Sequence, residues 1–388
     1  MDNLTHSLVG LTAAKAGLER LSPGASLLCV LAANSPDSDI AVILFGDRWD
    51  YLQHHRGITH SIVGVVSLAI LLPLIFYGVD RLWGRLRGQS PKTKLRGLLI
   101  VSFIVSATHP LLDWTNNYGV RFLLPWNPRW FYGDLVFIVD PFLWVVLGGA
   151  AFLLASKTRS SKFIWATFAA LVTLLIVAAP RSADLPNRTL IVALWITALI
   201  GTIVLYAIGA REKWGERIVF VAFAVVLAYW GALAFAHSRA LTQSREEAAR
   251  IVAPNGESVL RLAAMPTLAN PFRWDCVFET DRATYRFPVH LTADNSPPRV
   301  IRYEKPAGAL AQVLDTVEEQ KPARVFLGFA RFPVARLADP GCATQTLVQL
   351  ADLRYTEPGR SRGSFALELP VDCPNEPGTE GQMSEEGR

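Results

Sequence analysis

Charged residues are scarce in this sequence. Only 18% of its 388 residues are Asp, Glu, Lys or Arg, whereas 51% are hydrophobic. An average soluble domain is about 25% charged, so the shortage favours a membrane protein. The net charge of +5 does not by itself indicate a nucleic-acid partner, and we expect none. Much of that charge lies in short loops beside apolar runs, where Lys and Arg set the orientation of membrane helices.

Several signatures are missing as well. The four cysteines are too scattered for a CxxC metal site, and the sequence has neither a glycine-rich phosphate loop nor an internal repeat. Residues 1–8 lack a basic segment followed by an apolar core, so we expect no cleavable signal peptide. In an oxidising compartment Cys342 and Cys373 could pair, or either could pair with Cys276, and the sequence leaves the choice open.

What the chain does contain is a series of apolar runs. Residues 7–20 and 24–36 flank the turn signal Ser22-Pro23-Gly24. Each is too short to cross a hydrocarbon core of about 30 Å, so we predict a re-entrant helical hairpin. Longer runs predict about six spans, near 61–79, 97–112, 135–155, 163–179, 189–209 and 217–236. The predicted fold class is therefore an all-α polytopic membrane domain.

The chain changes character at residue 238. A polar amphipathic helix is expected at 238–253 and another helix at 307–319. Strands are expected at 258–264, 273–280, 283–291, 298–303, 324–331, 346–355 and 363–371. These patterns predict a small soluble domain, α+β or mostly β. We divide the chain into a metal-site membrane domain (1–155), additional transmembrane helices (156–237), an extracytoplasmic domain (238–373) and a disordered tail (374–388).

Loop charge orients the predicted spans. The loops 81–96, 156–162 and 210–217 are basic and are assigned to the inside. Alternation then places residues 54–60, 109–134 and everything after 237 outside. We therefore expect a multi-pass protein of a bacterial inner membrane, with its site and its carboxyl-terminal domain on the extracytoplasmic side and the lipid bilayer as its first partner.

Metal-binding residue types recur along the first 113 residues. Three of the seven histidines, His54, His55 and His60, lie within seven residues directly before an apolar run. His109 and Asp113 are spaced i, i+4 and so share one face of a helix. Imidazole and carboxylate groups together suit zinc and similar divalent ions. The candidate ligands are His6, Asp37, Asp39, His60, His109 and Asp113.

Each block also has a plainer explanation. Asp37 and Asp39 could form a turn or a helix cap, and the 54–61 cluster could be an interfacial patch. Asp140 before Pro141 is typical of a helix start. The placement of four blocks at one membrane face favours a shared site. It would hold one or two ions, with zinc favoured and manganese or magnesium also compatible.

The same blocks resemble a known family. They are Asp2-x-x-Thr5-His6, Pro36-Asp37-x-Asp39, His55-Arg56-Gly57-x-Thr59-His60-Ser61, and His109-x-x-x-Asp113 with Tyr118-Gly119. Their order and spacing resemble the LexA-binding, inner-membrane-associated metal-dependent hydrolase family over about residues 1–155, and the rest resembles its long members with a soluble tail. The resemblance implies a membrane hydrolase, while nothing in the sequence indicates a LexA partner.

A weaker similarity extends to zinc-dependent phospholipase C and P1-type nucleases. Those enzymes hold zinc through an amino-terminal residue, Asp and His side chains, and a His-x-x-x-Asp pair. His6, Asp37 or Asp39, His60, His109 and Asp113 are similar in kind and order. A later His-x-x-x-Glu is missing, so this similarity implies a mononuclear or dinuclear site.

These observations predict a metal-dependent hydrolase of a small-molecule or lipid phosphoester. Metal-activated water would be the nucleophile. His55 (or His54) would serve as a ligand or proton donor, and Arg56 would stabilise anionic charge in the transition state. Thr59, Ser61 and Asn117 would support the site. The alternative is a non-enzymatic, metal-binding membrane scaffold whose outer domain recruits a partner, and the sequence does not identify a protein partner.

Overall fold

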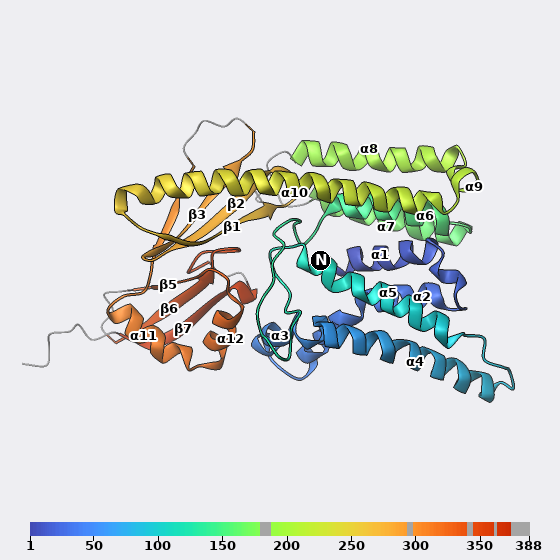
Figure 1. Cartoon of the computed structure of the whole chain (residues 1–388), viewed down its shortest axis with the longest axis horizontal. Coiled ribbons are helices and arrows are strands. Elements are labelled where there is room, and N and C mark those ends of the chain that lie inside the picture. The colour runs from blue at the N-terminus through green and yellow to red at the C-terminus, as the bar shows by residue number, and fades with distance from the viewer. Residues whose placement is uncertain (179–187, 293–297, 340–343, 361–362, 374–388) are drawn as a thin grey trace, which may run out of the picture. The chain divides into compact units, whose positions relative to one another are not determined.

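The computed structural model describes residues 1–178, 188–292, 298–339, 344–360 and 363–373 (Figure 1). The chain forms two compact units. The first comprises Met1–Ile40, His55–Arg239 and Pro266–Arg273, and the second comprises Ala41–His54, Ala240–Met265 and the chain from Trp274 onward. The tail 374–388, predicted to be disordered, lies outside the described residues.

The first unit is helical, as predicted. Its helices are α1 (Asn3–Lys15), α2 (Ala25–Asn34), α4 (Ile62–Leu86), α5 (Leu95–Trp114), α6 (Pro141–Ala155), α7 (Arg159–Ala178), α8 (Arg188–Ala207), α9 (Ala210–Trp214) and the first part of α10 (Arg217–Val252). Short 3-10 segments occur at Leu18–Arg20, Ser35–Leu44 and Ile58–His60. Within the described residues, five segments are long and apolar enough to cross a membrane: Ala25–Leu44, Ile62–Leu86, Leu95–Trp114, Arg159–Ala178 and Arg217–Asn255. Pro141–Ala155 and Ile191–Ala207 are shorter apolar helices.

The two helices expected to form a re-entrant hairpin are α1 and α2, which pack against each other and against α5. Ala25–Leu44 as a whole is long and apolar enough to cross a membrane, so the re-entrant geometry stays a prediction. The shared core of α1, α2 and α5 consists largely of alanines with a few larger side chains, such as Leu28, Leu98 and Val101. Small residues let helix backbones approach closely where lipid supplies no hydrophobic driving force. At Gly10 the approach is so close that an added Cβ would lie 2.6 Å from the Cys29 carbonyl oxygen.

The helical unit has two ends, and different segments of the chain meet at each of them. At one end the Lys94 amide donates to Ser22 Oγ at 2.9 Å, and Arg20 forms an ion pair with Glu216. The connections after α1, α4 and α9 therefore meet there, and we call this the basic end. At the opposite end, the Asp2 amide donates to the Ile138 carbonyl at 3.2 Å. The candidate ligands lie at this opposite end.

The second unit contains two small β-sheets. Strands β1 (Val259–Thr267), β2 (Asn270–Thr280), β3 (Ala283–His290) and β4 (Ile301–Glu304) are neighbours in that order. Strands β5 (Pro333–Leu337), β6 (Gln345–Asp352) and β7 (Ala366–Asp372) form a second, antiparallel sheet. The helices α3 (Arg48–His54), α11 (Ala309–Glu318) and α12 (Lys321–Phe329) complete the unit. Lys321 Nζ pairs with Asp50 Oδ1 at 2.7 Å and so links α12 to α3.

One sequence prediction was wrong in this region. Residues 324–331 were expected to be a strand, but most of them form α12. Pro322 suits the first helical turn, and Ala323, Phe326 and Phe329 are buried at a three-residue spacing that presents one helix face. The helix expected at 238–253 is confirmed. It continues the 217–236 span in α10, because no proline interrupts the chain before Pro254.

The cysteine predictions are partly answered. Cys276 carries a buried free thiol, so it does not take part in a disulfide. Cys373 is disulfide-bonded. Cys342 lies outside the described residues.

The Gly10 contact yields a stability prediction. Gly10→Ala should lower the free energy of unfolding by about 1–3 kcal/mol, because the methyl group would force α1 and α2 apart. Gly78→Ala in α4 is the control, since an added Cβ there meets nothing within 4 Å. The measurement is the thermal unfolding midpoint of purified protein in detergent. Equal midpoints for both variants would contradict the close packing of α1 on α2.

Candidate metal centre

Four short segments bring the candidate ligands together. Asp2 caps α1 by accepting the Thr5 amide at 3.0 Å, which places His6 in the first turns of that helix. Asp37 and Asp39 lie on the 3-10 segment after α2. His60 ends the 3-10 turn before α4, where Ser61 accepts the Gly64 amide and caps the helix. His109 and Asp113 lie one turn apart on α5.

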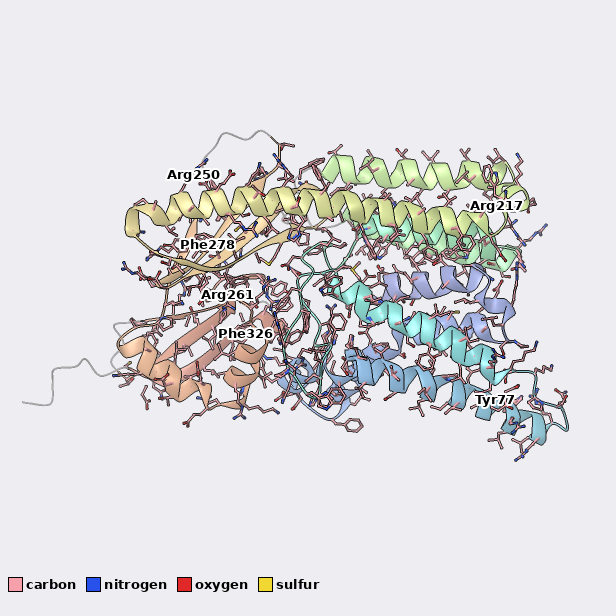
Figure 2. The ribbon with its side chains drawn as sticks, in the orientation of Figure 1. Tyr77, Arg217, Arg250, Arg261, Phe278 and Phe326 are labelled. Atoms are coloured by element: carbon pink, nitrogen blue, oxygen red, sulfur yellow. The ribbon has the colours of Figure 1, made fainter. Side chains whose placement is uncertain are left out.

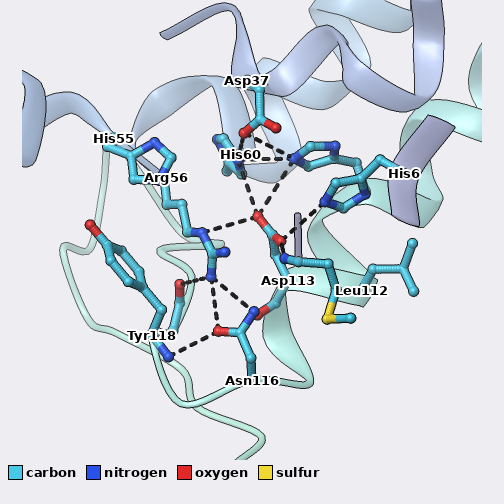
Figure 3. A network of polar contacts seen from close by, with 12 residues as sticks. His6, Asp37, His55, Arg56, His60, Leu112, Asp113, Asn116 and Tyr118 are labelled. Carbon is cyan, nitrogen blue, oxygen red and sulfur yellow. Dashed lines mark hydrogen bonds and ion pairs between the residues drawn. The ribbon is translucent and has the colours of Figure 1, made fainter. Parts of the chain in front are cut away.

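Asp37, His60, His109 and Asp113 form the centre of the cluster (Figure 3). The Nε2 atoms of His60 and His109 are 3.1 Å apart. Asp37 Oδ1 lies 3.3 Å from the first and 3.4 Å from the second. Asp113 Oδ2 lies 3.3 and 3.5 Å from the same two nitrogens. We call these four residues the tetrad.

These distances can be compared with the distances between the ligand atoms of a tetrahedral metal ion. Ligand atoms held about 2.0–2.2 Å from a tetrahedral ion lie roughly 3.3–3.6 Å from one another. Five of the six edges of the tetrad are 3.1–3.5 Å long, and the sixth is below 4.8 Å. The tetrad therefore has the dimensions of a four-ligand coordination shell.

The histidine protons support the same conclusion. His109 Nδ1 lies 2.6 Å from the Ala33 carbonyl oxygen, which can only accept, so this nitrogen carries the proton. Asp39 Oδ2 lies 3.4 Å from His60 Nδ1 and favours a proton there. Burial lowers the pKa of His60 to about 3, so the ring is neutral near pH 7. With both protons on Nδ1, the two Nε2 lone pairs lie 3.1 Å apart, and a cation between them would relieve their repulsion.

The outer contacts fit a metal centre equally well. Metal-bound imidazoles usually donate their second N–H to a carbonyl or a carboxylate, which fixes the orientation of the ring. The Ala33 carbonyl and Asp39 occupy these two positions. Three carboxylates, Asp37, Asp39 and Asp113, also gather in this cluster, and a divalent cation would offset part of their negative charge.

Arg56 is the guanidinium of the cluster. Its Nε lies 3.1 Å from Asp113 Oδ2, and its Nη1 donates to Asn116 Oδ1 at 3.0 Å. The group also lies over the Tyr118 ring, 4.6 Å from the centroid, and only 3% of the residue is exposed. Its backbone is left-handed, with φ 51°, and its amide donates to Asp39 Oδ2 at 2.9 Å. Arg56 therefore contacts Asp113 Oδ2 and helps to fix the orientation of that carboxylate.

His6 and Met1 contact the other oxygen of Asp113. His6 Nε2 lies 3.3 Å from Asp113 Oδ1, and its ring stacks on His109 with centroids 3.7 Å apart. The Met1 nitrogen contacts the same oxygen. Burial, together with the neighbouring His109, keeps the pKa of His6 well below its usual range. His6 thus joins the cluster through Asp113 and lies outside the tetrad.

His55 belongs to a second group. Together with Asp37 and Asp39 it offers three ligand atoms within 4.8 Å of one another. His55 Nδ1 lies 3.3 Å from Asp39 Oδ1. Its side chain is 18% exposed and that of Asp37 is 17% exposed, whereas the other tetrad side chains are at most 1% exposed. Solvent therefore reaches the cluster at the edge formed by His55 and Asp37.

Some predicted positions lie elsewhere, and some participants were not anticipated. His54 is exposed at the end of α3 and lies outside the cluster. Thr59 contacts Asp39 and His60, as expected of a supporting residue, whereas Ser61 serves as a helix cap. Asn116 and the Ala33 carbonyl were missed. No sequence pattern marks either, because their roles follow from where α5 and α2 end.

The comparisons with known proteins concern the same part of the chain. Residues 1–183 match the model of a family described as YdjM inner membrane protein. The Escherichia coli (strain K12) inner membrane protein YbcI is 28% identical over 158 residues, which cover 40% of this chain and 80% of YbcI. No solved structure matches.

A second relative is the uncharacterized protein YfhP of Bacillus subtilis (strain 168). It is 26% identical over 155 residues, which cover 37% of this chain and 43% of YfhP, so the match spans less than half of that relative. The family description and the name of YbcI are consistent with the multi-pass helical unit described above. Residues 1–183, which carry the whole His–Asp cluster, are thus similar to the YdjM inner membrane protein family.

Proposed function

We propose that this protein is a membrane-bound, metal-dependent hydrolase whose centre is the tetrad. The observation that carries the proposal is the 3.1 Å approach of two neutral imidazole nitrogens between two carboxylates. When bound, a divalent ion such as zinc would lower the pKa of water toward about 7 and polarise a scissile group. Buried ionisable groups near membrane depth are costly and usually functional.

The residues of the cluster would have different roles in this reaction. Asp37, His60, His109 and Asp113 would hold the ion, while Asp39 and the Ala33 carbonyl orient the two imidazoles. Arg56 positions Asp113 and adds positive charge beside it. His55, at the accessible edge, would hold a second ion together with Asp39 and Asp37, or donate a proton to the leaving group.

The surroundings of the centre favour a substrate that arrives from the lipid. Apolar side chains next to the ligands are exposed: Ile58 and Ile62 flank His60, and Leu111 and Trp114 flank Asp113. Exposed apolar side chains at the end of a membrane helix are typical of contact with lipid. A phosphoester of a lipid or a lipid-derived small molecule fits both this setting and the proposed chemistry.

One observation favours the scaffold alternative. Four protein ligands at tetrahedral spacing are typical of structural zinc sites, whereas catalytic sites keep a position open for water. The hydrolase therefore needs its open position at the edge formed by His55 and Asp37. A bound metal without turnover on any phosphodiester or lipid substrate, with and without chelator, would support the scaffold.

The tetrad makes a direct prediction about metal content. His60→Ala and His109→Ala should each reduce bound metal at least tenfold and abolish hydrolysis, because each removes one of four ligands. Metal per chain in purified protein is the measurement. His54→Ala is the matched control, since His54 is exposed and outside the cluster. Wild-type metal content in both tetrad variants would refute the site.

The accessible edge makes a second prediction. If two ions bind, His55→Ala should lower the metal content from two ions per chain to one while the protein stays folded. Turnover should fall at least a hundredfold, as expected when the reacting group is removed. Metal analysis and a phosphodiesterase assay on the same samples test this. Unchanged turnover would remove His55 from the mechanism.

Orientation is a separate proposal: the centre faces the extracytoplasmic side. A cysteine at Gln89, in the basic connection after α4, should resist an impermeant maleimide in right-side-out vesicles. A cysteine at Asn127, near the centre, should react, because basic loops stay inside. Background labelling should be low, since Cys29 and Cys276 are buried. The reverse pattern would place the centre in the cytoplasm.

A further inference from the structure

A polar cavity of about 630 Å³ lies at the basic end of the helical unit, away from the metal centre. Residues from the ends of four helices line it. Five of them are basic: Lys15, Arg20, Lys157, Arg211 and Arg217. Cavities of this volume are typical of small-molecule sites. The cavity is therefore large enough for a charged head group.

The charges of this cavity are not balanced. It contains two acidic residues, and both already have partners: Glu19 pairs with Lys15 at 2.5 Å, and Glu216 pairs with Arg20. Lys157, Arg211 and Arg217 form no ion pair with any residue that the structure describes. Three positive charges thus converge on one cavity, which favours an anion.

An apolar cavity of about 600 Å³ adjoins it. Its walls come from α6, α8, α9 and α10 and consist mainly of small or branched apolar residues. Trp214 and Arg217 line both cavities, so the two cavities are direct neighbours. Figure 2 shows Arg217 at the end of α10 beside α9. Gly201 helps to leave the space open, since an added Cβ there meets nothing within 4 Å.

We propose that the two cavities together form a binding site for an anionic phospholipid. The phosphate head group would lie among Lys157, Arg211 and Arg217, and acyl chain would occupy the apolar cavity. Basic pockets between membrane helices bind anionic head groups in this way. Trp214 at the junction suits the boundary between hydrocarbon and head groups. The tendency of basic loops to stay inside accounts for basic residues at this end, but it does not require them to line a cavity.

This site is independent of the proposed hydrolase. It lies at the Lys15 end of α1, whereas His6 and the tetrad lie at the other end. The helix has 13 residues and is roughly 20 Å long. Loss of lipid binding would therefore leave the metal content unchanged.

The test is native mass spectrometry of the delipidated full-length protein. It is titrated with dioleoylphosphatidylglycerol, with zwitterionic dioleoylphosphatidylcholine, and with soluble glycerol 3-phosphate. Combining Lys157→Gln, Arg211→Gln and Arg217→Gln should weaken phosphatidylglycerol binding on the order of a hundredfold, since each charge contributes about fivefold. Arg217→Gln alone, a milder change, should weaken it about fivefold. Gly201→Leu should weaken it by filling the apolar cavity.

The matched control combines Arg85→Gln, Lys92→Gln and Arg96→Gln. It removes the same charge from the same end but touches neither cavity, so binding should stay within twofold of wild type. An equal loss in this control would reduce the effect to general surface charge and overturn the proposal. Glycerol 3-phosphate that competes as well as the lipid, with Gly201→Leu inert, would make this a free-phosphate site and also overturn it.

Discussion

The repulsion between two facing imidazole nitrogens is the constraint on which the helical unit depends. His60 and His109 come from segments 49 residues apart, and their Nε2 atoms stay 3.1 Å from each other. With both ring protons on Nδ1, this proximity leaves two lone pairs close together, and a cation between them would relieve their repulsion. The carboxylates of Asp37 and Asp113 each lie 3.3 Å from His60 Nε2 and complete the four candidate ligands around that space. The ends of α2 and α5 and the start of α4 therefore converge on a single point, and a bound ion would connect three helices that lipid alone does not hold together.

The two ends of the helical unit differ in the charged residues that they carry. At one end carboxylates outnumber cations and neutral imidazoles line the interior, which suits a divalent ion. At the other, cations outnumber carboxylates around a cavity that neighbours an apolar one. The helix α1 contributes to both, with His6 near its start and Lys15 at its end.

The sequence indicated which ligand-type residues gather in the helical unit more clearly than it indicated the elements of the second unit. Histidine and aspartate are rare in an apolar chain, so His60, His109 and Asp113 were identifiable by residue type. His109 and Asp113 were also identifiable by their i, i+4 spacing. The sequence did not show how the residues of the cluster contact one another, because these contacts depend on which side-chain atoms face each other. Asp39 orients His60, and His6 reaches Asp113, for reasons of geometry alone. In α12 the alternation of Val325, Leu327 and Phe329 suggested a strand, whereas packing against one helix face decided the outcome.

Arg56 carries a final consequence. A left-handed backbone is a conformation that glycine adopts freely and that costs other residues about 1 kcal/mol or more. The next residue, Gly57, has φ −89° and ψ −129°, outside the regions that most residues adopt, so two consecutive residues take uncommon backbone conformations and the first of them is an arginine. A position of this kind marks where the chemistry of a guanidinium outweighs the local preference of the polypeptide.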